Sequence, residues 1–144
     1  MGEVRVKVAL SNASDEALAR RGALPLDHVR RYDADALVDT GAVGTVAPVF
    51  VVQQLGLLSY DRRVIEVADG RQELVEVAEP AVLRIDGRVT TEELLVLGDE
   101  VLVGQTVLEK MDLLVDPARH RVVPNPAHPD QPVTKVKWRH RESA

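Results

Sequence analysis

The chain lacks cysteine, has few aromatic residues and contains no long apolar run, and each absence excludes a class of protein. Without cysteine there is neither a disulfide nor a thiolate metal site. No stretch is apolar enough to cross a bilayer, and charged residues interrupt the N-terminal segment where a signal peptide would need an apolar run. The net charge of −5 argues against nucleic acid as the main partner. We therefore expect a cytoplasmic protein that binds neither membranes nor nucleic acid.

Cofactor and metal signals are also missing. The sequence has no phosphate-binding loop, no dinucleotide fingerprint and no constellation around a nucleophilic serine. Its four histidines are scattered among basic or proline-rich residues and lack the spacing of metal ligands. We therefore expect no cofactor and no metal.

What remains is the composition of a globular domain with an aliphatic core. The 144 residues are 45% hydrophobic and 28% charged, which is usual for a soluble domain large enough to bury a core. Aromatic residues make up only 3%, so valine and leucine must fill that core. Because valine in short runs favours strands, we predict an all-β fold with short helices.

One stretch, 36–42, places an acid where burial would be costly. Ala-Leu-Val is typical of a buried strand, and it runs directly into Asp39. Gly41 permits a sharp turn that brings backbone N–H groups to the carboxylate, and Thr40 adds a hydroxyl nearby. The alternative is an ordinary turn, because aspartate, threonine and glycine all favour turns. The tripeptide alone favours the ordinary turn.

The N-terminal part predicts a strand, an excursion and a second strand. Residues 4–8 alternate valine with charged residues, which indicates a half-buried strand. Ser14 is the expected N-cap of a helix over 15–21. A further helical turn is expected over 25–30, before a strand over 32–38 that leads to the acid.

After the acid the sequence predicts a short helix from Pro48 to Gly56. Phe50, Leu55 and Leu58 are expected to line one side of it. The strand, the acidic turn and this helix would then form one unit.

Two hairpins follow. The runs 64–68 and 74–78 bracket Asp69-Gly70, a strong signal for a hairpin turn. This hairpin is either plain sheet or a mobile flap over a cleft. Pro80 is expected to end its second strand, and a separate hairpin is predicted over 82–97.

The C-terminal part repeats the pattern of an apolar strand that ends in glycine. Strand 101–104 is expected to lead into a helical turn over 106–111, and strands 113–115 and 119–123 would close the domain. We divide the chain into a domain over 1–124 and a proline-rich linker and arm over 125–144. Within that arm, alternating residues predict a final edge strand over 133–138.

Together these elements resemble the retropepsin-like (clan AA) aspartic proteases, in particular the small single-domain prokaryotic branch. The resemblance rests on the loop 36–42, the hairpin at Asp69-Gly70 and the strand 101–104, and it covers about Tyr32 to Pro124. It implies an all-β acid protease barrel with short helices and one lobe per chain.

The resemblance also implies roles for residues. Asp39 would be the catalytic acid of an endopeptidase that hydrolyses polypeptides without a cofactor. The mechanism needs two carboxylates that share one proton, one activating water while the other donates to the scissile carbonyl. Because each chain supplies a single copy, the resemblance implies a homodimer with Asp39 of each chain at the two-fold axis.

Other residues would support this dyad. Thr40 would brace the pair, Gly41 would contact the substrate backbone, and Ala42 would complete the loop. Val103 and Gly104 would form a structural second loop. The flap that closes over the peptide would comprise Val67, Ala68, Asp69, Gly70, Arg71 and Gln72.

The sequence departs from the viral pattern in three places. Viral members commonly have an acid where Val43 stands and an arginine where Gln105 stands, and here both partners of that ion pair are absent. The flap tip is charged instead of glycine-rich. The excursion at 14–31 has no counterpart in the minimal viral enzyme. An alternative function is therefore a catalytically idle retropepsin-like domain that binds peptides or serves assembly.

Overall fold

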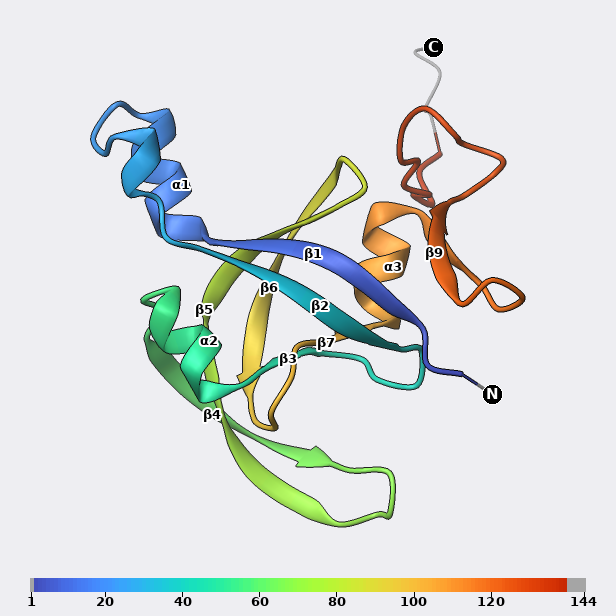
Figure 1. The fold of residues 1–144 in the computed structure, drawn as a ribbon, viewed down its shortest axis with the longest axis horizontal. Helices are drawn as coiled ribbons and strands as arrows, with labels where there is room; N and C mark the ends of the chain where they lie inside the picture. Colours follow the sequence, from blue (N-terminus) through green and yellow to red (C-terminus); the bar gives the residue numbers. More distant parts are fainter. Residues whose placement is uncertain (1, 140–144) are drawn as a thin grey trace.

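The computed structural model describes residues 2–139, which form a β barrel with short helices at its ends (Figure 1). The strands are β1 (Arg5–Asn12), β2 (Arg31–Asp39), β3 (Thr45–Ala47), β4 (Ser59–Glu66), β5 (Gln72–Ile85), β6 (Arg88–Val96), β7 (Leu102–Gly104), β8 (Leu113–Asp116) and β9 (Arg121–Pro124). The helices are α1 (Ala13–Arg20), the 3-10 helix η1 (Leu26–His28), α2 (Val49–Gln54) and α3 (Gln105–Met111). The all-β fold with short helices is confirmed.

Six strands close on themselves. Their order is β1-β2-β7-β3-β6-β5, and β5 pairs back with β1, so the sheet has no free edge within this ring. β4 lies outside the ring and pairs with β5 alone. β8 and β9 form a separate two-stranded sheet. Closure satisfies the backbone groups that an open sheet would expose.

β7 lies between β2 and β3, although it comes much later in the chain. It runs parallel to β2, with Asp39 opposite Gly104, and antiparallel to β3, with Val46 opposite Leu102. The loop after Asp39 must therefore span the end of β7 to reach β3. This arrangement fixes both ends of the loop that carries the acid.

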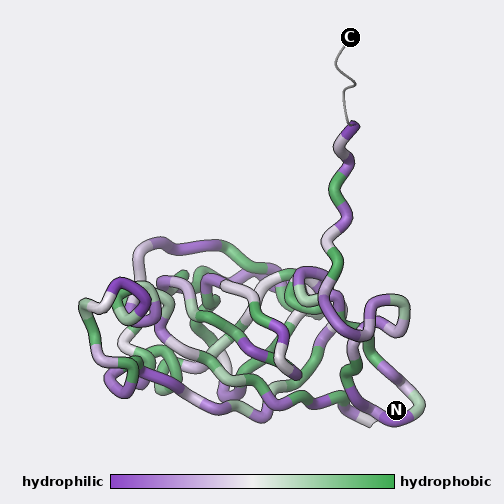
Figure 2. The backbone as a smooth tube through the Cα atoms, turned by 90° about the horizontal axis from the view of Figure 1, so that it is seen from above, coloured by the Kyte–Doolittle hydropathy of each residue, from purple (hydrophilic) through white to green (hydrophobic). Residues whose placement is uncertain are grey.

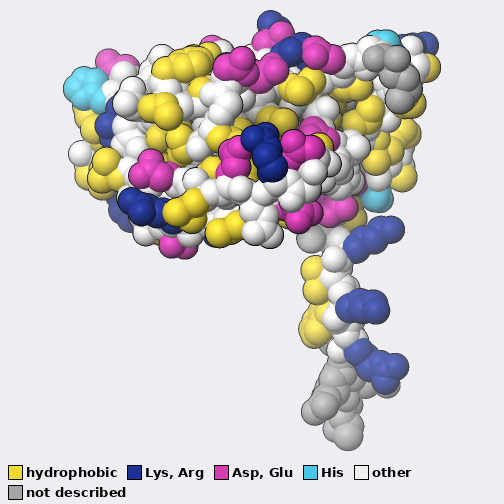
Figure 3. All heavy atoms as spheres, turned by 90° about the horizontal axis from the view of Figure 1, so that it is seen from below, with side chains coloured by type: hydrophobic (Ala, Val, Ile, Leu, Met, Phe, Trp, Pro, Cys, Tyr) yellow, Lys and Arg dark blue, Asp and Glu magenta, His cyan; other side chains and the backbone are white. Residues whose placement is uncertain are grey.

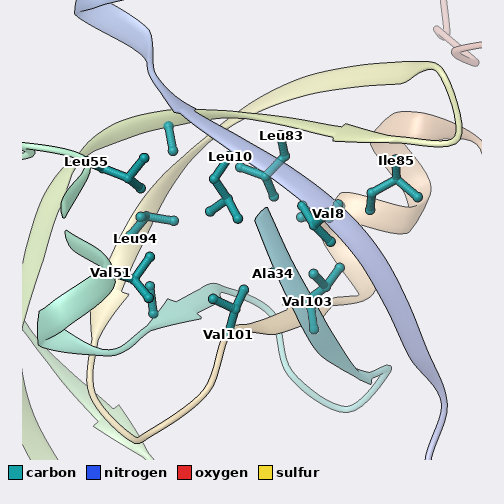
Figure 4. Close-up of a cluster of buried hydrophobic side chains, with 14 of the residues drawn as sticks. Val8, Leu10, Ala34, Val51, Leu55, Leu83, Ile85, Leu94, Val101 and Val103 are labelled. Carbon is teal, nitrogen blue, oxygen red and sulfur yellow. The ribbon is translucent and has the colours of Figure 1, made fainter. Parts of the chain in front are cut away.

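The interior of the barrel is aliphatic, as the composition predicts. Leu10, Leu55, Leu83 and Leu94 are fully buried and converge from different elements (Figure 4). Burying a leucine side chain stabilises a fold by about 1.5–3 kcal/mol. The barrel is thus stabilised by many small aliphatic contacts, without a large aromatic cluster.

Helix α1 begins at a different cap from the one expected. Asn12, not Ser14, is the N-cap: its Oδ1 accepts a hydrogen bond from the Asp15 N–H at 3.0 Å. The Asn12 amide also donates to the Leu55 carbonyl at 2.8 Å. Because Asn12 is buried at the end of β1, it caps the helix and ties it to the barrel at once.

Helix α2 occurs where expected, but its buried face was predicted wrongly. Leu55 is fully buried, whereas Phe50 and Leu58 are 54% and 69% exposed. Val51 and Val52 are buried instead. Phe50 packs edge-on against Tyr32 with ring centroids 6.2 Å apart, outside the core. The helix is too short for its three spaced apolar residues to share one face.

The hairpin at Asp69-Gly70 is present, but Pro80 does not end its second strand. β5 continues through Pro80 to Ile85 and pairs first with β4 and then with β1, while β6 pairs along most of its length. The register with β6 shifts between Ala78 and Ala81, and this irregularity accommodates a residue that has no N–H to donate. The two predicted hairpins therefore share one long strand.

The predicted edge strand over 133–138 is absent: no ladder forms among the described residues of this segment. From Val133 the chain leaves the body as an extended arm (Figure 2). Figure 3 shows Lys and Arg side chains spaced along it. The sequence of this arm contains Lys135, Lys137 and Arg139. Residues 140–144 of the predicted arm lie outside the described residues.

Candidate active site

Asp39 is the last residue of β2 and is exposed to solvent. Its Oδ1 accepts a hydrogen bond from the Gly41 N–H at 3.0 Å, and its carbonyl oxygen accepts one from the Ala42 N–H at 3.1 Å. Thr40, also exposed, lies between them in the turn. The strand thus delivers the carboxylate to the surface, and the turn orients it with a backbone donor.

The end of β7 and the first residue of α3 pack against this turn. The Gln105 N–H donates to the Ala42 carbonyl oxygen at 3.0 Å. A Cβ on Gly104 would lie 2.5 Å from the same oxygen, so only glycine lets the two segments approach this closely. Val103 is fully buried beneath them. The structure therefore brings the predicted second loop, Val103 and Gly104, directly against the acidic loop.

A pocket of about 520 Å³ lies beside the acidic loop. One wall is formed by consecutive residues, Gly41 to Val46, and the opposite wall by strands β4 and β6. Its surface is more apolar than polar, and its lining includes four charged side chains. The residues are Gly41, Ala42, Val43, Gly44, Thr45, Val46, Arg63, Ile65, Glu66, Glu92, Glu93, Leu95 and Thr106.

The predicted flap residues form the tip of the β4–β5 hairpin. The turn is closed by hydrogen bonds between Val67 and Arg71 at 2.8 Å and between Gly70 and Val67 at 2.9 Å. Asp69 accepts from the Arg71 N–H at 2.9 Å, and Ala68 and Gln72 complete the tip. None of these six residues lines the pocket. Ile65 and Glu66, which immediately precede the tip at the end of β4, line the pocket instead.

Sequence reasoning missed a polar cluster on the pocket wall. Glu93 on β6 accepts hydrogen bonds from the Tyr60 hydroxyl at 2.5 Å and from the Arg63 guanidinium at 2.9 Å. These two donors lower the pKa of Glu93 below its ordinary value. The partners are separated by about thirty residues in sequence, so only the Glu-Glu pair inside an apolar strand could have drawn attention to this site.

A second ion pair lies on the same wall. Glu92 accepts from the Thr45 hydroxyl at 3.1 Å and forms an ion pair with Lys110 of α3. Thr45 itself is buried. These contacts join Thr45 of β3, Glu92 of β6 and Lys110 of α3.

The turn over 39–42 carries a single carboxylate, that of Asp39. Among residues 2–139, the only hydrogen bond that the Asp39 carboxylate accepts comes from Gly41. The described part of the chain has no group of three or more residues that could hold a metal ion. Nor does it contain a helix long and apolar enough to span a membrane. What the described residues place at this turn is one exposed carboxylate, oriented by a backbone N–H.

Comparisons with known proteins identify the fold through structure and not through sequence. No protein-family model matches the chain, and no curated protein matches it by sequence. The retroviral protease-like domain of Ddi1 from Leishmania major is similar in structure, with a TM-score of 0.53 and 12% identity over 88% of this chain and 90% of that domain.

Two viral proteases are also similar. The Simian Foamy Virus (mac) protease has a TM-score of 0.45 and 15% identity, covering 72% of this chain and 90% of its own. The EIAV protease, solved with the inhibitor HBY-793, has a TM-score of 0.49 and 18% identity, covering 76% of this chain and 88% of its own. The likeness to the Ddi1 domain carries the assignment, together with the closed barrel. The chain has the retropepsin-like aspartic protease fold.

Proposed function

We propose that this protein is an aspartic endopeptidase that acts as a homodimer, with one Asp39 from each chain forming the catalytic pair. The observation that carries the proposal is the position of Asp39: an exposed carboxylate at the end of a barrel strand, oriented by the Gly41 N–H beside a pocket. A carboxylate placed this way is open to a partner and to substrate.

The dyad would act as coupled acid and base. Two carboxylates held close share one proton, because both cannot ionise at short distance. The ionised member removes a proton from water, while the protonated member donates to the carbonyl oxygen of the scissile peptide bond. An extended polypeptide would lie along the pocket, between the acidic loop and β4.

The decisive experiment is cleavage of an unfolded protein between about pH 3 and pH 7, with the Asp39→Asn variant beside the wild type. We expect the variant to lose at least about a hundredfold in rate, because a neutral amide cannot act as base. Asp35→Asn is the matched control: Asp35 is exposed on the same strand, and its replacement should leave cleavage unchanged.

The outcome separates two functions. Absence of cleavage at every pH, or equal cleavage by wild type and Asp39→Asn, would overturn the protease. Peptide binding by a wild type that cleaves at no pH, unchanged in Asp39→Asn, would instead indicate the idle domain that binds peptides or serves assembly. That second function has the same pocket but no requirement for the carboxylate.

A further inference from the structure

In the flap hairpin, defined here as residues 59–78, the outer strand β4 has little that holds it in place. β4 pairs with β5 alone, outside the closed ring. Along β4 only Ile65 is even partly buried, so the strand contributes almost nothing to the core. The β5 strand of the hairpin is held by its pairing with β6 and by buried Val75, Val77 and Ala78. A strand paired on one side only and without a buried face is only marginally stable in water. The position of β4 over the pocket must therefore depend on its ladder with β5 and on specific side-chain contacts.

Those contacts converge on one carboxylate. Tyr60 and Arg63 of β4 reach across β5 and each bond one oxygen of Glu93, at 2.5 Å and 2.9 Å. Both oxygens of the carboxylate are used, which fixes its orientation. Glu93 lies on β6, inside the ring, and lines the pocket together with Arg63.

We propose that Glu93 is a positioning residue that ties the flap hairpin to the barrel and sets its height over the pocket beside Asp39. The effect on catalysis rests on the proposed function. The contact of Glu93 with Tyr60 and Arg63, called the clamp below, is a property of the fold. Glu93 does not touch the reacting atoms. It acts through Tyr60 and Arg63, and its loss would let the hairpin open.

Hydrogen exchange measures the clamp without reference to activity. In Glu93→Gln we expect amide exchange over residues 59–66 to accelerate about two- to fivefold, as befits a partly exposed charged pair. Exchange in β1 and β2, inside the ring, should stay as in the wild type. Glu73→Gln is the matched control, because Glu73 lies on the same hairpin but its 3.7 Å ion pair with Arg71 stays within the hairpin. Its exchange over 59–66 should not change.

Kinetics and rescue distinguish positioning from simple loss of stability. If the hairpin covers substrate, Glu93→Gln should raise KM by a similar factor and change kcat less, because the reacting groups are untouched. Exchanging the charges, with Arg63→Glu and Glu93→Arg together, should restore slow exchange, whereas Arg63→Glu alone should not.

Two failures can be told apart. A wild type that never cleaves would overturn the proposed function, while the exchange measurement would still decide whether the clamp exists. Unchanged exchange over 59–66 in Glu93→Gln would overturn the clamp, even if cleavage falls. Failure of the charge exchange to restore slow exchange would also contradict it.

Discussion

Gly104 lies opposite Asp39 in the parallel ladder of β7 and β2, and a Cβ on Gly104 would come within 2.5 Å of the Ala42 carbonyl oxygen. Replacing Gly104 with alanine must therefore displace the loop that carries the acid. We expect Gly104→Ala to lower the free energy of unfolding by about 1–3 kcal/mol and to reduce cleavage. Thermal unfolding and a cleavage assay measure the two effects.

Gly44→Ala is the control for this prediction. A Cβ on Gly44 would come within 2.7 Å of the Leu95 Cδ1, the far end of a flexible side chain that can rotate away. Gly44→Ala should lower the free energy of unfolding clearly less than Gly104→Ala, because the atom that obstructs a Cβ on Gly104 is a backbone oxygen. Equal costs at the two glycines would contradict this explanation.

A second prediction concerns how the stability of the protein changes at acid pH through Glu16 of α1. Two nitrogens of Arg84 bond both oxygens of Glu16, at 2.6 Å and 2.7 Å, and lower the pKa of Glu16 from 4.5 to about 2. Because the pKa is lower in the folded state, the carboxylate stabilises the protein above about pH 4.5. That contribution is lost as the pH falls from about 4.5 to about 2. It amounts to at most about 3 kcal/mol at neutral pH.

Denaturant unfolding of Glu16→Gln checks this linkage. The difference in stability between wild type and variant should be large at pH 7 and shrink toward zero as the pH approaches 2. Glu76→Gln, an exposed change on β5, should show little difference at any pH. A Glu16→Gln deficit that stays constant with pH would mean that its charge is not responsible.

A third prediction concerns the segment that precedes the arm. The carboxylate of Asp112 accepts hydrogen bonds from Asn125 at 2.9 Å and from the Val133 N–H at 3.0 Å, and its Oδ2 lies 2.6 Å from His128 Nδ1. The amide of Asn125, chiefly, lowers the pKa of Asp112 to about 2. Asp112→Asn should loosen residues 125–133, because asparagine carries no charge and offers only one acceptor oxygen.

Limited proteolysis measures this loosening. Cleavage within 125–133 should be faster in Asp112→Asn than in wild type, while the barrel resists digestion in both. Asp130→Asn, an exposed change in the same segment, should behave as wild type. If the two variants are digested at the same rate, Asp112 does not anchor the segment.

The proposed dyad makes a fourth prediction, about concentration. Since each chain carries one Asp39, dilution below the dissociation constant of the dimer should lower the specific activity, and light scattering should show monomers over the same range. Covalent cross-linking of dimers should remove the dependence. Full specific activity in a sample that scatters as monomer would exclude a dyad shared between chains.

The sequence predicted the features that depend on local chemistry. The turn at Asp69-Gly70, the strand before Asp39 and the strand before Gly104 all carry short-range signals of alternation or glycine. Pairing partners were harder to predict. Nothing local announces that β5 passes through Pro80 and then closes the ring on β1, because the register shift that makes this tolerable is a tertiary feature.

The contacts of Glu93 on the pocket wall were not predicted for the same reason. Glu93 reads in sequence as one of two adjacent acids on a strand. Its partners Tyr60 and Arg63 become neighbours only once β5 has paired with β4 on one side and with β6 on the other. The N-cap of helix α1 also depends on a tertiary contact. Asn12 and Ser14 are both residue types that cap helices, and the hydrogen bond from buried Asn12 to the Leu55 carbonyl favours Asn12.

The insertion of β7 between β2 and β3 has a consequence for the order in which the protein matures. The Asp39 loop receives its support from Gly104 and Gln105, so a chain emerging from the ribosome carries the acid long before it carries what holds the acid in place. Contacts this distant in sequence form late, because the intervening segment must first be closed into a loop. The loop that carries Asp39 would thus take its final shape only after Gly104 and Gln105 have been synthesised and have docked against it.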